Sequence, residues 1–211
     1  MEKILIISAT EFEIEAFKNK VSLEKDSRFE FIITGVGMLE TCFSITHYLL
    51  ENKHLINPNT LLLNVGIAGA FNHTTTLGDI YEVEQDILSE LGAENKECFI
   101  SIDELGFGKS NFERNPKIET GLTLKKSITV NKVHGNQTSI QAIIERLNPN
   151  LESMEGASVF FTAEKFQMPT QQIRSVSNYV EERNKEKWDI PLAIKSLNNW
   201  LIEFFYPVKS L

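Results

Sequence analysis

The sequence predicts an α/β fold in which one sheet carries helices on both faces. Short runs of consecutive aliphatic residues, typical of buried strands, alternate with segments of helical periodicity. Such alternation indicates a sheet that is covered on both sides. No internal repeat, low-complexity tract or Pro/Gly-rich linker interrupts the 211 residues. We therefore expect a single domain over residues 1–211.

The first third of the chain shows the alternation most clearly. Four consecutive aliphatic residues predict a buried strand over Lys3–Ser8. Carboxylates at the start of Glu11–Val21 favour a helix there, because they interact well with the positive end of the helix dipole. A second strand is expected over Phe29–Thr34, followed by a turn at Gly35–Gly37 and a helix over Leu39–Leu50.

The third strand, Leu61–Val65, is expected to end in a glycine- and alanine-rich loop, Gly66–Ala70. In α/β sheets, ligands bind at the carboxyl ends of strands, so this loop and the residues after the other strands are candidate site positions. The remaining expected elements are β-rich stretches over Asp79–Ile87 and Ile118–Asn131, helices over Thr138–Leu147 (capped by Thr138 or Ser139), Glu155–Phe166 and Trp188–Phe205, and a strand over Gln171–Ser177.

The charge balance excludes several classes of partner. A formal charge of -8 and a pI near 5.1 oppose binding to nucleic acid or to anionic membranes, both of which need a positive field. A small-molecule substrate remains compatible with this charge.

Cysteine and histidine usage indicates no disulfide and no metal or other cofactor. Cys42 and Cys98 are far apart, and the four histidines lack metal-ligand spacing. The apolar run Ile4–Ile7 is too short for a signal peptide or a membrane span, so a cytoplasmic protein is expected.

Gly35-Val36-Gly37 follows a strand and precedes a helix, as a dinucleotide-binding loop would. The third glycine of that fingerprint would fall at Glu40, where an acid would repel a pyrophosphate. A tight connection between strand and helix is the preferred interpretation.

Four segments, read together, carry a resemblance. They are Ser8-Ala9-Thr10-Glu11-Phe12-Glu13, Leu63-Asn64-Val65-Gly66-Ile67-Ala68-Gly69, Glu152-Ser153-Met154-Glu155-Gly156-Ala157 and Ile173-Arg174-Ser175-Val176-Ser177-Asn178-Tyr179-Val180. In this order the chain, from Ile4 to about Ile202, resembles the nucleoside phosphorylase and nucleosidase superfamily. It is most similar there to purine nucleosidases for methylthioadenosine and S-adenosylhomocysteine, and above all to futalosine hydrolases. These release hypoxanthine from futalosine in menaquinone biosynthesis.

The resemblance implies a three-layer α/β/α fold whose central mixed sheet is partly barrel-like, and a homodimer or larger homo-oligomer. It implies that Glu13 activates water, that Glu155 holds the ribose hydroxyls with Met154 against the sugar, and that Asn178 contacts the purine. Three further residues of these segments are expected to contact the substrate: Ala68, Gly69 and Ser177.

The proposed chemistry is consistent with these residue types. Cleavage of an N-ribosidic bond passes through an oxocarbenium-like state, which requires a positioned water, a grip on the ribose and a stabilised leaving base. One carboxylate can accept from two ribose hydroxyls, which suits Glu155. Related phosphorylases keep phosphate-binding arginine and serine residues where this chain has Asn64 and Ile67. Because a phosphate dianion needs charged donors, water is the expected nucleophile.

Asn178 bears on the identity of the base. Adenine-specific nucleosidases have aspartate at this position. Hypoxanthine presents acceptors at both N7 and O6, so two amide protons suit it better than an ionised carboxylate. A mismatched buried polar pair costs about 1–3 kcal/mol, which is enough for discrimination. The expected substrate is therefore a 6-oxopurine nucleoside.

Other interpretations remain open at this point. Glu13 and Glu155 could be first-turn helix acids, and Arg174 suits a structural ion pair. The function could instead be release of adenine from methylthioadenosine or S-adenosylhomocysteine, or non-catalytic binding of a nucleoside. The benzoate of futalosine would want a cation, for which a neighbouring subunit and three residues of this chain are candidates: His73, His134 and Arg183.

Overall fold

The computed structural model describes residues 3–96 and 98–208. Its first strand is β1 (Lys3–Ser8), whose aliphatic run is buried. β1 pairs in parallel with β2 (Phe29–Ile33) on one side and with β3 (Thr60–Ala70) on the other. The strands that the aliphatic runs predict in this part of the chain are thus confirmed.

β3 is longer than the sequence suggests, and the expected loop at Gly66–Ala70 is wrong. The strand continues through these residues and pairs with β10 (Thr170–Tyr179) and, at its end, with β9 (Leu151–Ser153). The small residues of this segment make room for side chains from β10. A Cβ on Gly66 would lie 2.7 Å from Nη1 of Arg174. The segment Gly66–Ala70 is therefore a strand whose surface is covered by side chains of β10.

Five strands close into a barrel. β10 pairs with both β3 and β4 (Ile80–Leu88), β4 continues to β8 (Leu124–Thr129), and β8 pairs with β9, which returns to β3. Parallel and antiparallel pairs are mixed around the ring. β1 and β2 extend the sheet outside it. The mixed, partly barrel-like sheet is therefore confirmed. Outside the ring, β7 (Asn111–Glu113) pairs with β4, and β5 (Gly92–Asn95) with β6 (Cys98–Ser101).

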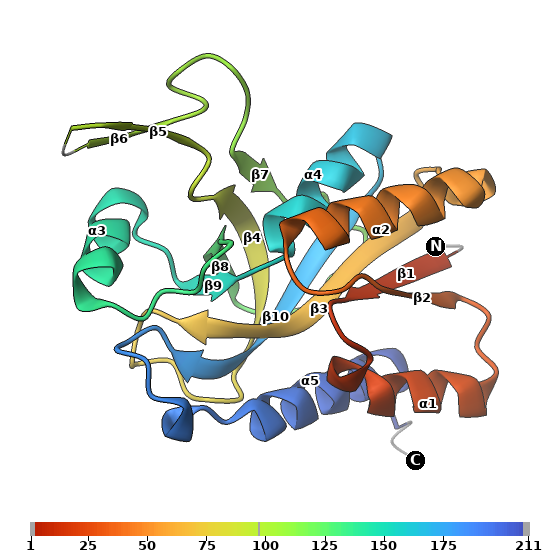
Figure 1. Cartoon of the computed structure of the whole chain (residues 1–211). Coiled ribbons are helices and arrows are strands. Elements are labelled where there is room, and N and C mark those ends of the chain that lie inside the picture. Colours follow the sequence, from red (N-terminus) through yellow and green to blue (C-terminus); the bar gives the residue numbers. More distant parts are fainter. Residues whose placement is uncertain (1–2, 97, 209–211) are drawn as a thin grey trace.

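Helices cover both faces of the sheet (Figure 1). α1 (Glu15–Glu24) and α5 (Ile190–Phe205) lie on one face, and α2 (Met38–Glu51) and α4 (Gly156–Phe166) on the other. Alternate residues of β1 divide between the two cores, Ile4 and Ile6 toward α1 and α5, Leu5 and Ile7 toward α2 and α4. α3 (Gln137–Leu147) packs Ile143 against the end of β8.

The helix boundaries bring smaller corrections. The segment from Glu11 begins with a 3-10 turn, Glu11–Glu13, before α1 starts at Glu15. α3 is capped by Asn136, whose side chain accepts from the amides of Thr138 and Ser139. These two residues were expected to be the cap themselves. Two further 3-10 turns lie at Lys53–Leu55 and Lys185–Lys187. Within residues 3–96 and 98–208, no helix is long and apolar enough to cross a membrane.

Candidate active site

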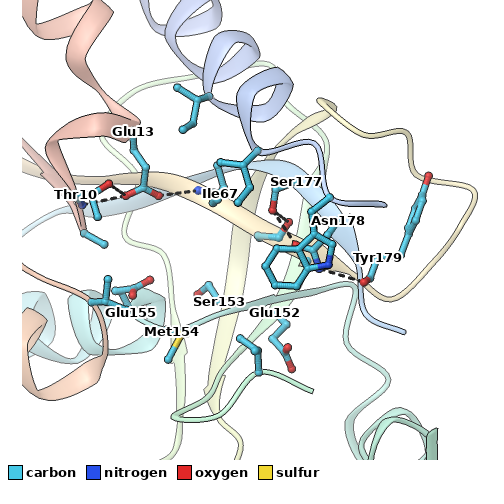
Figure 2. Close-up of a pocket in the computed structure, with 18 of the residues that line it drawn as sticks. Thr10, Glu13, Ile67, Glu152, Ser153, Met154, Glu155, Ser177, Asn178 and Tyr179 are labelled. Carbon is cyan, nitrogen blue, oxygen red and sulfur yellow. Dashed lines mark hydrogen bonds between the residues drawn. The ribbon is translucent and has the colours of Figure 1, made fainter. Parts of the chain in front are cut away.

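A cavity of about 300 Å³ lies where the ends of β3, β9 and β10 meet the Glu11–Glu13 turn and the start of α5. Its lining includes all seven residues that the sequence singles out: Glu13, Ala68, Gly69, Met154, Glu155, Ser177 and Asn178. Figure 2 shows Glu13 and Glu155 at one end of this pocket and Asn178 at the other. Segments that are distant in sequence thus converge on one pocket.

Glu13 is held by the loop that follows β1. Its Oε2 accepts hydrogen bonds from the hydroxyl of Ser8 (3.2 Å) and from the amide and hydroxyl of Thr10 (both 3.0 Å). Its Oε1 accepts from the amide of Ile67 at 3.2 Å. Glu13 is therefore a helix-capping acid, as its position in the first turn suggests, and also a pocket residue. Oε2 is fully engaged, whereas Oε1 retains capacity for a further donor.

Glu155 precedes α4, and its Oε1 accepts the amide of Gly37 at 3.0 Å. Gly35 and Gly37 have φ values of +83° and +96°, in the region that favours glycine. The Gly35–Gly37 turn, expected only as a tight connection, thus aims a backbone donor at Glu155. Burial raises the pKa of Glu155, although the charge of Arg174 and the Gly37 amide oppose that shift.

Arg174 of β10 is a fully buried cation beside both acids. Burial lowers its pKa, and the charges of Glu155 and Glu13 oppose the change. Its Nη2 donates to the side-chain oxygen of Asn64. Among the described residues, every direct ion pair is made by other side chains, so the ion pair expected for Arg174 does not form directly. The neutral side-chain oxygen of Asn64 accepts the hydrogen bond from the guanidinium, and the charge of Arg174 interacts with Glu13 and Glu155 without direct contact.

Asn178 lies within β10, at a bulge, and not in a loop beyond it as expected. Its Oδ1 accepts the hydroxyl of Ser177 at 2.8 Å, and its Nδ2 donates to the carbonyl of Tyr179 at 3.1 Å. One of the two Nδ2 protons is thus used internally, and the other is free for a ligand. A Cβ on Gly69 would lie 3.0 Å from Nδ2, so glycine is needed for this approach.

The pocket lining also contains Glu152, which the sequence does not single out, and His134 and Arg183, which are candidate partners of a benzoate. Glu152 lies in the pocket wall, and its carboxylate accepts the amide of His134 at 2.9 Å and also contacts the imidazole Nδ1. The sequence offers one indication of this role, because Glu152 lies in the same short segment as Glu155, three residues before it. Of the three candidate cations, His134 and Arg183 line the pocket. His73 is not among its lining residues; its ring stacks on Tyr179 at 4.2 Å.

The apolar part of the lining includes Trp188, over which the guanidinium of Arg183 lies at 5.2 Å from the ring centre. Aromatic faces of this kind can stack on a planar base. Within residues 3–96 and 98–208, no three His, Cys, Asp or Glu side chains are grouped so that they could hold a metal ion.

Comparison with known proteins adds independent information. No family model matches the chain. A futalosine hydrolase of Streptomyces coelicolor is 26% identical over 178 residues, which cover 81% of this chain and 76% of that protein. A futalosine hydrolase of Thermus thermophilus is 24% identical over 82% of this chain and 79% of that protein.

Among solved structures, the methylthioadenosine/S-adenosylhomocysteine nucleosidase of Helicobacter pylori, bound to butyl-thio-DADMe-Immucillin-A, superposes with a TM-score of 0.76. The match covers 99% of both chains at 15% identity. The chain therefore has the fold of the nucleoside phosphorylase and nucleosidase superfamily, in the form found in methylthioadenosine nucleosidases.

Proposed function

We propose that this protein is a purine nucleosidase that hydrolyses futalosine to hypoxanthine and dehypoxanthine futalosine. The observation that carries the proposal is the presence of two acids, the buried Glu13 and the half-buried Glu155, at one end of a pocket that has Asn178 at its other end. Similarity to two futalosine hydrolases over about four fifths of the chain supports the choice of substrate.

In the proposed reaction the bond between C1′ of the ribose and N9 of the base breaks, and the electron pair leaves with the base. Glu155 accepts hydrogen bonds from the ribose hydroxyls. Glu13 accepts a proton from water through Oε1 while the water oxygen bonds to C1′. Asn178 cannot supply a proton, so it stabilises the developing negative charge on the base by donating a hydrogen bond. The released base takes up a proton from solvent water, and Glu13 returns to solvent the proton that it accepted, so the products are neutral hypoxanthine and dehypoxanthine futalosine.

Several contacts support water, not phosphate, as the nucleophile. Asn64, at the position of a phosphorylase arginine, is buried and engaged by the backbone of β1 and by Arg174. The amide of Ile67 is already donated to Glu13. Among the described residues, Arg183 is the only lysine or arginine in the pocket lining. A phosphate dianion would lack the charged donors that it requires.

A methylthioadenosine nucleosidase is the second candidate, and a specific feature favours it. Three apolar residues line the pocket close in sequence to Glu13 and Gly37. Ala9 and Phe12 precede Glu13, and Val36 precedes Gly37, whose amide binds Glu155. An uncharged thioether would suit this surface. For futalosine, we propose Arg183 as the partner of the benzoate, since it lines the pocket, whereas the imidazole Nδ1 of His134 already contacts Glu152.

The test is incubation with futalosine, inosine and methylthioadenosine, with and without phosphate, followed by identification of the released base and sugar. Phosphate-independent release of hypoxanthine from futalosine is expected. Glu13→Gln should lower kcat at least about 100-fold, the usual contribution of a general base. Glu11→Gln is the matched control, because Glu11 is exposed and pairs with Lys18. Release of adenine alone would favour the second candidate, and release of ribose 1-phosphate would overturn hydrolysis.

The proposed assembly is a cytoplasmic homo-oligomer. Leu39 and Phe43 on α2 are 85% and 68% exposed, and an apolar surface of this kind supports an interface between copies. Light scattering of the purified protein would measure the oligomeric state.

A further inference from the structure

Glu152 is a buried carboxylate that the proposed reaction leaves without a role. It lies in β9, is 4% exposed, and lines the same pocket as Asn178. In the sheet, Glu152 is paired with Gly69 on one side of β3, and Asn178 is paired with Gly69 on the other. Paired residues project from the same face of a sheet, so both side chains are directed to the same end of the pocket.

The spacing of these two residues fits a planar base. Their Cα atoms are separated by two strand spacings, or about 10 Å. Figure 2 shows Glu152 and Asn178 in one part of the pocket, apart from Glu13 and Glu155. The Gly69 position between them carries no side chain, and the Asn178 amide therefore lies over β3, where a Cβ on Gly69 would be 3.0 Å from its Nδ2.

Glu152 is fixed in place but retains acceptor capacity. Its Oε1 accepts the backbone amide of His134 at 2.9 Å, and its Oε2 contacts the Nδ1 of the same residue. Each carboxylate oxygen can accept a second hydrogen bond. A buried acid anchored on one side and facing a cavity on the other is suited to receive a donor from a ligand.

We propose that Glu152 determines base specificity by accepting a hydrogen bond from N1–H of a 6-oxopurine. This inference rests on the proposed nucleosidase function. A 6-oxopurine presents a donor at N1 and acceptors at O6 and N7, which match an acceptor from Glu152 and the one free Nδ2 proton of Asn178. Adenine has an acceptor lone pair at N1, so two acceptors would face each other and neither would receive a hydrogen bond. The two strands that flank Gly69 thus recognise complementary edges of one base.

The experiment uses hypoxanthine, 1-methylhypoxanthine and adenine as ligands of the full-length protein, with binding measured by calorimetry. Wild-type protein is expected to bind hypoxanthine roughly 10- to 100-fold more tightly than either of the other bases, as expected for one buried hydrogen bond. Glu152→Gln should reduce the preference for hypoxanthine over adenine at least about tenfold, because an amide can donate to N1 of adenine.

Glu90→Gln is the matched control, since the Glu90 carboxylate also accepts a backbone amide of the same loop, that of Asn131, but is exposed and outside the pocket lining. Its base preference should equal that of the wild type. Equal binding of hypoxanthine and 1-methylhypoxanthine by the wild type would overturn the inference. So would an unchanged preference in Glu152→Gln.

The two proposals fail separately. If the protein releases a base from a nucleoside but shows neither of these preferences, only the role of Glu152 is refuted. If it releases no base from any nucleoside, the nucleosidase function is refuted, and the binding of the free bases still decides the role of Glu152.

Discussion

Replacing Asn178 with aspartate tests the proposed recognition of the base. In Asn178→Asp, the atom that now donates to the carbonyl of Tyr179 at 3.1 Å becomes an oxygen facing another oxygen. A protonated carboxyl has one proton where the amide has two, so it can satisfy Tyr179 or the base but not both. A 6-oxopurine would lose a hydrogen bond from a buried site. The expected cost is about 1–3 kcal/mol, or roughly 5- to 150-fold in kcat/KM.

The assay compares hypoxanthine release from inosine with adenine release from adenosine, because these substrates share the same sugar. The ratio of kcat/KM for inosine to that for adenosine should fall by the factor given above, since the 6-amino group of adenine can donate a hydrogen bond to a carboxyl oxygen. Asn136→Asp is the control, because it adds the same charge at the exposed cap of α3, where both residues cap well. An equal loss on both substrates would refute the argument.

Two further substitutions probe the buried surroundings of the site. Burial raises the pKa of Asp86 from 3.8 to about 6, so its protonated form is favoured in the fold and stability falls by about 3 kcal/mol as pH rises from 3.8 to 6. Asp86→Asn should remove this fall, and urea unfolding between pH 4 and 7 measures it; parallel curves for the two proteins would contradict the prediction. In Gly66→Ala, the new Cβ would lie 2.7 Å from Nη1 of Arg174 and 3.0 Å from Oε1 of Glu13. Displacement of these groups should cost about 1–3 kcal/mol and lower kcat at least about tenfold, whereas a variant with full kcat would show that the site tolerates the shift.

Much of the fold follows from local pattern. The aliphatic run of β1 and the apolar periodicity of α2 are strong signals, because β1 is buried on both faces and α2 buries one face against the sheet. The resemblance of four segments to nucleosidases also led to residues that line one pocket, including Glu13 and Glu155. Their individual roles remain predictions.

The missed features depend on tertiary contacts. Glycine and alanine in Gly66–Ala70 have low strand propensity, and only pairing with β10 and β9 on either side makes the segment a strand. The amide that Gly37 donates to Glu155 joins residues far apart in the chain, so neither segment alone reveals it. Glu152 was passed over for the same reason, because its relation to Asn178 is set by the register of three strands.

The way in which the barrel closes has a consequence for folding. β3 pairs in parallel with β10, beginning with Leu62 opposite Thr170, so this ladder forms only after a long stretch of chain has been ordered. Contacts of such wide sequence separation slow folding, because the loop entropy is lost before the contacts form. Arg174 and Asn178 both lie on β10, and a newly made chain therefore has no complete pocket until β10 has been synthesised. A purine nucleoside that binds at Asn178 would hold β10 in place and thereby stabilise the native state of the whole barrel.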